Sequence, residues 1–148
     1  MLNTEFFEQF PTTEELAAHI ADNTDKYGPV SVSQFIKDNL PKEASFQTKV
    51  IKALQDWSKV GNIDKGAVIW KQSAGVYNRN GMPDVMAVID GKLFGFEIKR
   101  PYIGKATALQ QKTIRQLNKA GAVAEVICYP EEARQLIIKA GCWRGDPA

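Results

Sequence analysis

The sequence predicts an α/β domain in which a mixed β-sheet is flanked by helices, preceded by a helical N-terminal extension. The length of 148 residues, with 44% hydrophobic and 24% charged residues, is typical of one globular domain. From residue 43 onward, helical and strand periodicities alternate in the order helix, three strands, helix, strand, helix. The helix between the last two strands is long enough to connect a parallel pair, so we expect both parallel and antiparallel pairing.

The N-terminal extension, residues 1–41, differs from the rest of the chain in charge. It carries two basic and seven acidic side chains, a net charge of −5, whereas residues 42–148 carry 17 basic and 10 acidic side chains, a net charge of +7. Such asymmetry is typical of a chain whose basic part contacts nucleic acid or a membrane surface, although an ordinary solvated surface is an equal alternative. The extension itself is interpreted as a helical cap, a partner surface, or a nucleic-acid mimic that covers a basic cleft.

We expect the extension to form two short helices separated by residues 27–29. Hydroxyl side chains able to cap these helices are Thr12 or Thr13 and Ser31 or Ser33. The second helix would end at Asn39, before Pro41. The domain boundary is therefore placed at 41, with residues 42–148 as the core domain.

The first core helix and the central strands follow. Phe46, Val50, Leu54 and Trp57 recur at helical spacing, which predicts an amphipathic helix with lysines on its outer face. Residues 67–70 are predicted to form a strand, and residues 73–82 a loop rich in glycine and asparagine. Two further strands, 84–89 and 93–99, flank Asp90-Gly91, a strong signal for a two-residue hairpin turn.

The last third of the chain predicts helix, strand and helix. A helix leads from Thr107 to Ala120 and stops at Gly121, a strand over 122–128 is apolar enough to be covered on both faces, and a final helix covers 131–140. Cys128 and Cys142 form no Cys-x-x-Cys pair and are read as packing residues. No leader peptide or membrane span is recognisable, so we expect an intracellular, cytoplasmic protein. A phage protein made inside a bacterial host would also fit this expectation.

Three charged side chains of the predicted hairpin converge at one end of the sheet. Glu97 and Lys99 are two residues apart on a strand and share a face, and antiparallel pairing brings Asp84 beside Glu97. Two adjacent carboxylates repel one another unless a cation lies between them, and Mg²⁺ or Mn²⁺ prefers such oxygen ligands. With Lys99 to orient water, this arrangement suits phosphodiester hydrolysis. The alternative interpretation gives these residues no chemical role. Pro83-Asp84 would then be a turn that enters a strand, and Glu97-Ile98-Lys99 would be the ordinary alternation of a half-solvated strand.

These residues and their flanks resemble the VRR-NUC (virus-type replication and repair nuclease) branch of the PD-(D/E)xK nucleases. The match runs in order from about Glu43 to Tyr129. Its motifs are Glu43-Ala44-Ser45-Phe46-Gln47, Gly81-Met82-Pro83-Asp84, Glu97-Ile98-Lys99, Gly104-Lys105 and Gln110.

The resemblance implies a restriction-endonuclease-like αβββαβ core and a set of roles at one site. Asp84, Glu97, the Ile98 backbone carbonyl and Glu43 would bind the metal, and Lys99 would assist the attacking water. Gln110 would line the same site. Two of these residues have structural alternatives, because Gln110 fits a capping box with Thr107, and Glu43 suits a helix N-terminus on electrostatic grounds.

The expected function is a Mg²⁺- or Mn²⁺-dependent DNA endonuclease, selective for branched DNA such as four-way (Holliday) junctions, as in DNA repair. A homodimer is implied by the resemblance. The alternatives are a non-cleaving nucleic-acid-binding or regulatory protein of the same fold, and a restriction-type nuclease with sequence preference. Binding of a nucleotide triphosphate is not expected, because Ala106 follows Gly104-Lys105 where a phosphate loop needs Ser or Thr. The candidate DNA-backbone contacts are Lys71, Arg79, Arg100, Lys105 and Lys112.

Overall fold

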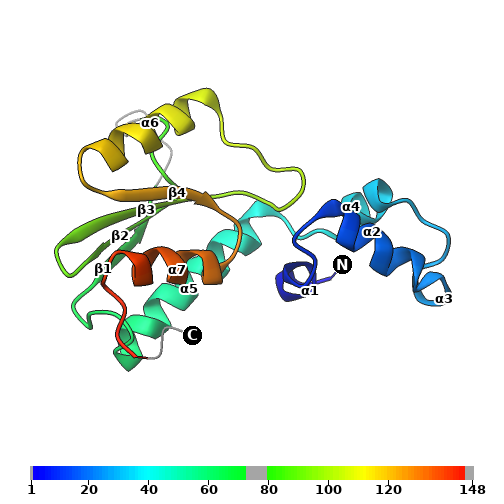
Figure 1. The fold of residues 1–148 in the computed structure, drawn as a ribbon, viewed down its shortest axis with the longest axis horizontal. Helices are drawn as coiled ribbons and strands as arrows, with labels where there is room; N and C mark the ends of the chain where they lie inside the picture. The colour runs from blue at the N-terminus through cyan, green and yellow to red at the C-terminus, as the bar shows by residue number, and fades with distance from the viewer. Residues whose placement is uncertain (1, 73–79, 146–148) are drawn as a thin grey trace.

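The protein is a three-layered α/β structure with a group of short helices at one end (Figure 1). The computed structural model describes residues 2–72 and 80–145. The N-terminal helices are α1 (Thr4–Glu8), α2 (Thr13–Ala21), α3 (Thr24–Tyr27) and α4 (Val32–Asn39). The core consists of α5 (Glu43–Val60), β1 (Val68–Lys71), β2 (Val85–Ile89), β3 (Lys92–Ile98), α6 (Ala108–Lys119), β4 (Val123–Ile127) and α7 (Pro130–Lys139).

The sheet has the strand order β1-β2-β3-β4, with the first three strands antiparallel and β4 parallel to β3. Helix α6 covers one face near β4, while α5 and α7 pack against each other on the opposite face (Figure 1). The order helix, three strands, helix, strand, helix and the mixed sheet confirm the predicted fold class.

The hairpin between β2 and β3 turns at Asp90-Gly91, as predicted. Both residues have positive φ, 52° and 77°, the combination that a type I′ turn requires and that this dipeptide adopts at low cost. The turn fixes the register, so that Val85 lies opposite Phe96 and Ile89 opposite Lys92. Consequently, the residues just outside this ladder, Asp84 and Glu97, are also brought opposite one another.

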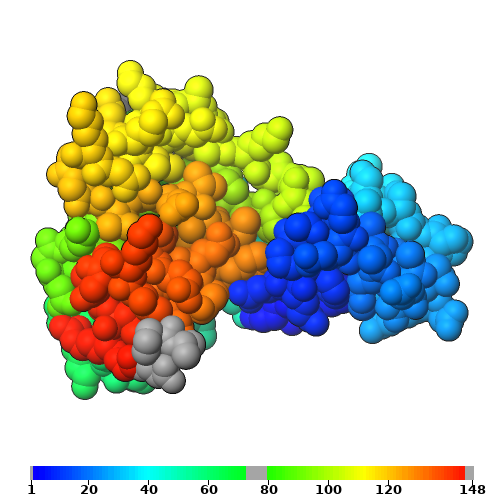
Figure 2. Space-filling model, in the orientation of Figure 1, coloured from blue at the N-terminus to red at the C-terminus, as the bar shows by residue number. Residues whose placement is uncertain are grey.

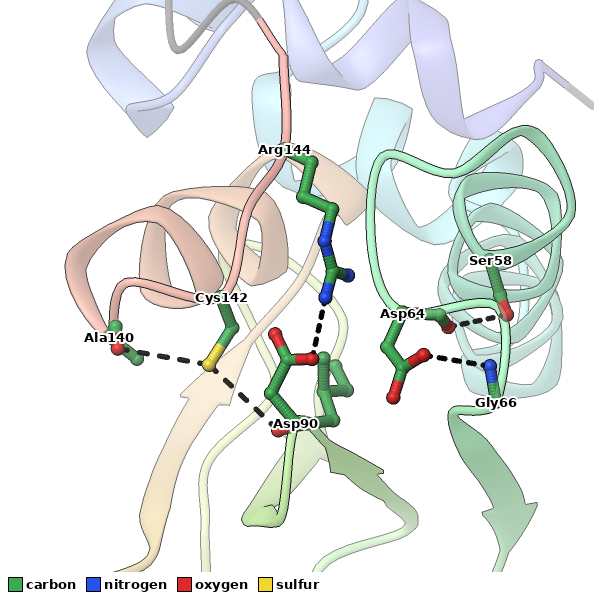
Figure 3. A network of polar contacts seen from close by, with 8 residues as sticks. Ser58, Asp64, Gly66, Asp90, Ala140, Cys142 and Arg144 are labelled. Carbon is green, nitrogen blue, oxygen red and sulfur yellow. Dashed lines mark hydrogen bonds and ion pairs between the residues drawn. The ribbon is translucent and has the colours of Figure 1, made fainter.

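A clasp from the C-terminal segment holds the hairpin turn (Figure 3). The Arg144 guanidinium lies 2.8 Å from the Asp90 carboxylate, and the Cys142 thiol donates weakly to the Ile89 carbonyl at 3.8 Å. Cys142 is buried and both cysteines are free, which agrees with their interpretation as packing residues. The clasp lies at the opposite end of the hairpin from Asp84 and Glu97.

One hydrophobic core runs through the α5 and α7 side of the sheet and into the N-terminal helices. Alternate residues of β2 and β3 point toward α5 and α7 and are fully buried, and the buried face of α5 meets them. The same cluster of buried side chains includes Phe7, Leu16 and Phe35 from the N-terminal helices. These helices are thus packed against the core by apolar contacts, and they lie beside the sheet (Figures 1 and 2).

The N-terminal segment forms four short helices where the sequence predicted two. Thr12 and Ser31 cap α2 and α4 through their hydroxyl groups, as expected, and α4 ends at Asn39. The prediction missed α1 and α3, which have five and four residues. Helices this short have no measurable stability of their own, so tertiary packing decides whether they form. In α1 that packing is aromatic, because Phe6 and Phe7 contact Phe35.

The loop after β3 is joined to α1 by the Tyr102 hydroxyl. This hydroxyl lies 2.6 Å from the carbonyl of Phe10, just after α1, and 3.2 Å from the carbonyl of Phe7 in α1. Tyr102 has a φ of 67°, a conformation that a non-glycine residue adopts only at some cost. Lys49 of α5 adds an ion pair to Glu5 of α1 at 2.8 Å. The segment that follows Lys99 is therefore anchored to the N-terminal helices.

The prediction that the fourth strand is covered on both faces is confirmed in part. α6 and α7 pack against β4 and bury Ala124 and Ile127, but Glu125 in the middle of this edge strand is exposed. Asn118 of α6 bonds both the amide and the carbonyl of Ala124 with its side chain, at 2.9 and 2.8 Å. It thereby occupies the outward-facing polar groups at that point and blocks addition of another strand there. Within the described ranges, no helix is long and apolar enough to span a bilayer.

Replacing Tyr102 with phenylalanine is expected to lower the free energy of unfolding by about 1 kcal/mol, because it removes the hydroxyl that joins the loop to α1. Urea denaturation followed by circular dichroism measures the change. Tyr129→Phe is a matched control, since the buried Tyr129 hydroxyl has no hydrogen-bond partner in the described part of the chain. Equal losses in the two variants would contradict the anchoring role of Tyr102.

Candidate functional site

The candidate site lies where β2 begins and β3 ends. Asp84 directly precedes β2, and the register of the hairpin places it opposite Glu97. The Asp84 carboxylate accepts a hydrogen bond of 3.0 Å from the Ile98 amide, which fixes it against the end of β3. The structure therefore brings together the two carboxylates that the sequence predicted to meet.

Glu97 is a fully buried acid. Its residue is 0% exposed, and neither carboxylate oxygen is hydrogen-bonded within residues 2–72 and 80–145. The pKa of Glu97 is raised from 4.5 to about 9, first by burial and then by the neighbouring Asp84 carboxyl group, while the Lys99 ammonium opposes the rise. The site thus holds a carboxyl group whose ionised form is costly unless positive charge is added.

Lys99 and Glu43 complete the charged cluster. The Lys99 ammonium lies 3.7 Å from the Glu43 carboxylate, which is carried by the first residue of α5. The Lys99 side chain is 15% exposed, so most of its length is packed and its position is restricted. Glu43 also adds to the rise in the pKa of Glu97, so the other three charged groups all act on Glu97.

Two close backbone approaches place Asp84. A Cβ on Gly81 would lie 2.8 Å from Leu109 Cγ of α6, and the φ of 84° at Gly81 also favours glycine. A Cβ on Gly95 of β3 would lie 2.8 Å from the ring of Pro83. The loop before Asp84 is therefore seated on α6 at Gly81 and on β3 at Pro83.

A third glycine shapes the chain after Lys99. A Cβ on Gly104 would lie 2.6 Å from the Arg100 carbonyl oxygen and 2.9 Å from Lys99 Cβ, so any other residue would displace this turn. Sequence reasoning singled out Gly104 for its motif but missed Gly95. The signal was present, since a glycine inside a predicted strand indicates the close approach of another segment.

The described residues offer a partial coordination shell for a metal. No group of three or more His, Cys, Asp and Glu side chains in the described ranges gathers closely enough to hold an ion. Asp84 and Glu97 alone fit Mg²⁺, which typically takes one or two carboxylates and completes its octahedron with water and phosphate oxygens. The two unpaired, buried Glu97 oxygens are the observation that favours a cation here. The Ile98 carbonyl as a further ligand stays a prediction.

Gln110 has the structural role that the sequence also allowed. Its side-chain oxygen accepts a hydrogen bond of 2.8 Å from the Thr107 amide, and the Thr107 hydroxyl accepts one of 3.1 Å from the Gln110 amide. This reciprocal pair is a complete capping box at the start of α6. A role of Gln110 at the site stays a prediction.

The predicted DNA-contacting cations are spread over several elements. Arg100 and Lys105 lie on the loop after Lys99, Lys105 and Lys112 are exposed, and Lys112 belongs to α6. Lys71 pairs opposite Val85, whose side chain enters the core, so Lys71 starts from the sheet face opposite Glu97. Arg79 lies outside the described residues.

Comparisons with known proteins give one structural likeness. No family model matches the chain, and a search of curated proteins finds no match. A solved structure described as a VRR_NUC domain is similar to this chain with a TM-score of 0.48 and 22% sequence identity. The similarity covers 62% of this chain and 92% of the other.

Glu97→Gln is expected to stabilise the metal-free protein increasingly as the pH rises from 5 to 8. The folded state holds a proton on Glu97 that the unfolded state loses above pH 4.5, so stability from this group falls as pH rises toward 9. The amide has no such loss. The free energy of unfolding of Glu97→Gln minus that of the wild type should be larger at pH 8 than at pH 5. The increase should exceed about 1.4 kcal/mol, the equivalent of one pKa unit.

Urea denaturation in EDTA at both pH values measures this difference. Glu125→Gln on the neighbouring β4 is the matched control, because its side chain is exposed, and its effect should not depend on pH. If the difference in unfolding free energy between Glu97→Gln and the wild type is the same at pH 5 and pH 8, the assigned burial of Glu97 is contradicted.

Proposed function

We propose that this protein is a divalent-metal-dependent endonuclease that hydrolyses phosphodiester bonds of DNA. The observation that carries the proposal is the fully buried, unpaired Glu97 carboxylate opposite Asp84 and beside Lys99. Two facing carboxylates destabilise the folded protein when no cation is bound, and the same arrangement binds a cation favourably. The resemblance of the surrounding motifs to the VRR-NUC nucleases supports the same reading.

Asp84, Glu97 and the Ile98 carbonyl would hold Mg²⁺ or Mn²⁺. When bound, such an ion offsets charge on a phosphoryl oxygen and lowers the pKa of water. Lys99 would orient the attacking water and stabilise the negative charge that develops on the phosphate. Glu43, whose carboxylate lies 3.7 Å from the Lys99 ammonium, would hold that ammonium in place. A direct contact of Glu43 with the metal is the alternative role.

The proposed substrate is branched DNA such as a four-way junction, cut by a homodimer. Both features are supported by the resemblance, and two-fold symmetry would present two sites to the two strands of a junction. Exposed Lys105 and Lys112 near the site would contact the phosphate backbone.

Lys99→Ala is expected to lower the cleavage rate of branched DNA by at least about 100-fold, the usual range for loss of a group that assists proton transfer or stabilises charge. The assay compares labelled four-way junction, flap, single-stranded and duplex DNA with Mg²⁺, Mn²⁺ or EDTA. Lys92→Ala is a matched control, since Lys92 lies at the other end of the same strand. EDTA should abolish cleavage by every active variant.

Cleavage that persists in EDTA, or that is equal in Lys99→Ala and Lys92→Ala, would contradict this mechanism. Tight binding of branched DNA without cleavage in either metal would favour a non-cleaving nucleic-acid-binding protein. Cutting at one short sequence in plain duplex would favour a restriction-type enzyme.

A further inference from the structure

Several exposed apolar side chains flank the candidate site. Trp70 is at the end of β1, Ile103 follows Lys99 in the next loop, and Leu109 of α6 contacts the loop before Asp84. All three are large hydrophobic residues with more than a third of their surface exposed. An intact duplex presents mainly polar sugars and phosphates to a protein surface. These apolar side chains therefore suit a ligand that also exposes the apolar faces of unstacked bases.

Trp70 lies on the same face of the sheet as the two carboxylates. It pairs opposite Met86, two residues along β2 from Asp84, and the ladder continues to a hydrogen bond of 2.7 Å from the Gln72 amide to the Asp84 carbonyl. Residues opposite one another share a face, and so do residues two apart on a strand. Trp70 and Asp84 are diagonal neighbours, with Cα atoms about 7–8 Å apart.

The polar atom of the Trp70 indole ring already has a hydrogen-bond partner. Its Nε1 donates a hydrogen bond of 3.1 Å to the Gln72 side-chain oxygen, yet Trp70 remains 37% exposed. Val68, on the same face of β1, is 58% exposed. Among the described residues, helix α6 packs against β4, at the sheet edge opposite β1. The Trp70 ring therefore offers a ligand an exposed apolar surface.

We propose that Trp70 stacks against an unpaired nucleobase of the strand that is cut, with Val68 extending the contact. This inference rests on the proposed nuclease function and specifies its substrate as DNA with unpaired nucleotides beside the scissile phosphate. A Cα separation of about 7–8 Å between Trp70 and Asp84 is short enough for a base close to the scissile phosphate to reach the ring. In an intact duplex each base is stacked on its neighbours, so the ring finds a partner where pairing is interrupted.

The test measures DNA binding and base stacking with the full chain in EDTA, where no cleavage competes. The probes are a single strand and a flap carrying 2-aminopurine at each of the three positions on either side of the cut site, and an intact duplex. Trp70→Ala is compared with Trp70→Phe, which keeps a stacking ring, and with Val60→Ala, an exposed valine at the end of α5. Circular dichroism and thermal unfolding verify that each variant is folded.

Trp70→Ala should weaken binding of the single strand and the flap by about 5- to 150-fold, the range for one stacked base. Wild type and Trp70→Phe should quench the 2-aminopurine fluorescence, and Trp70→Ala should not. Binding of intact duplex should be equal in all four proteins, and Val60→Ala should match wild type throughout.

Cleavage by the wild type in Mg²⁺ or Mn²⁺, measured alongside, separates the two proposals. A wild type that cuts DNA while Trp70→Ala binds every probe equally well would overturn the stacking role alone. A wild type that cuts nothing, with the Trp70-dependent binding and quenching intact, would overturn the nuclease function and keep the stacking site. An equal loss of duplex and single-strand binding in Trp70→Ala would also overturn the stacking role.

Discussion

The local structure around the candidate site is organised by one costly arrangement, a buried Glu97 carboxyl group opposite Asp84. Facing acids at the ends of two strands are costly, because burial removes solvent screening and both groups cannot readily be ionised together without a cation. Three contacts hold them together: the Ile98 amide bond to Asp84, the seating of Pro83 on Gly95, and the seating of Gly81 on α6. The glycines of this region are therefore required by close packing around the acids.

The two ends of the β2–β3 hairpin have different physical characters. At the turn, Arg144, Asp90 and Cys142 form a polar clasp whose charges are paired and whose thiol is buried (Figure 3). At the open end, the Glu97 carboxyl oxygens have no hydrogen-bond partner among the described residues, and apolar side chains are exposed. The turn is thus held by paired groups, whereas the open end carries groups available for binding, as expected where a rigid element supports a functional site.

The N-terminal helices are part of the support of the site. Their acidic charge in the sequence suggested a cap, a partner surface or a nucleic-acid mimic, and the structure joins them to the core through Phe7 and Phe35. Tyr102 ties α1 to the loop that follows Lys99, and Glu5 neutralises Lys49 on α5. The small net charge of +2 therefore combines an acidic group of helices with a more basic core, and at least one acid–base pair crosses between them.

The sequence by itself determined the order of the core elements, the Asp90-Gly91 turn, the mixed sheet and the meeting of Asp84 with Glu97, because periodicity and turn chemistry act over a few residues. Tertiary structure decided the rest. The short helices α1 and α3 contribute Phe6 and Tyr27 to aromatic packing on Phe35, and β4 became an edge strand with Glu125 exposed. The burial of Glu97, the approach of Pro83 to Gly95 and the open face at Trp70 depend on which segments distant in sequence lie against each strand. No local pattern carries that information, because packing free energy is set by neighbours that are chosen only when the whole chain folds.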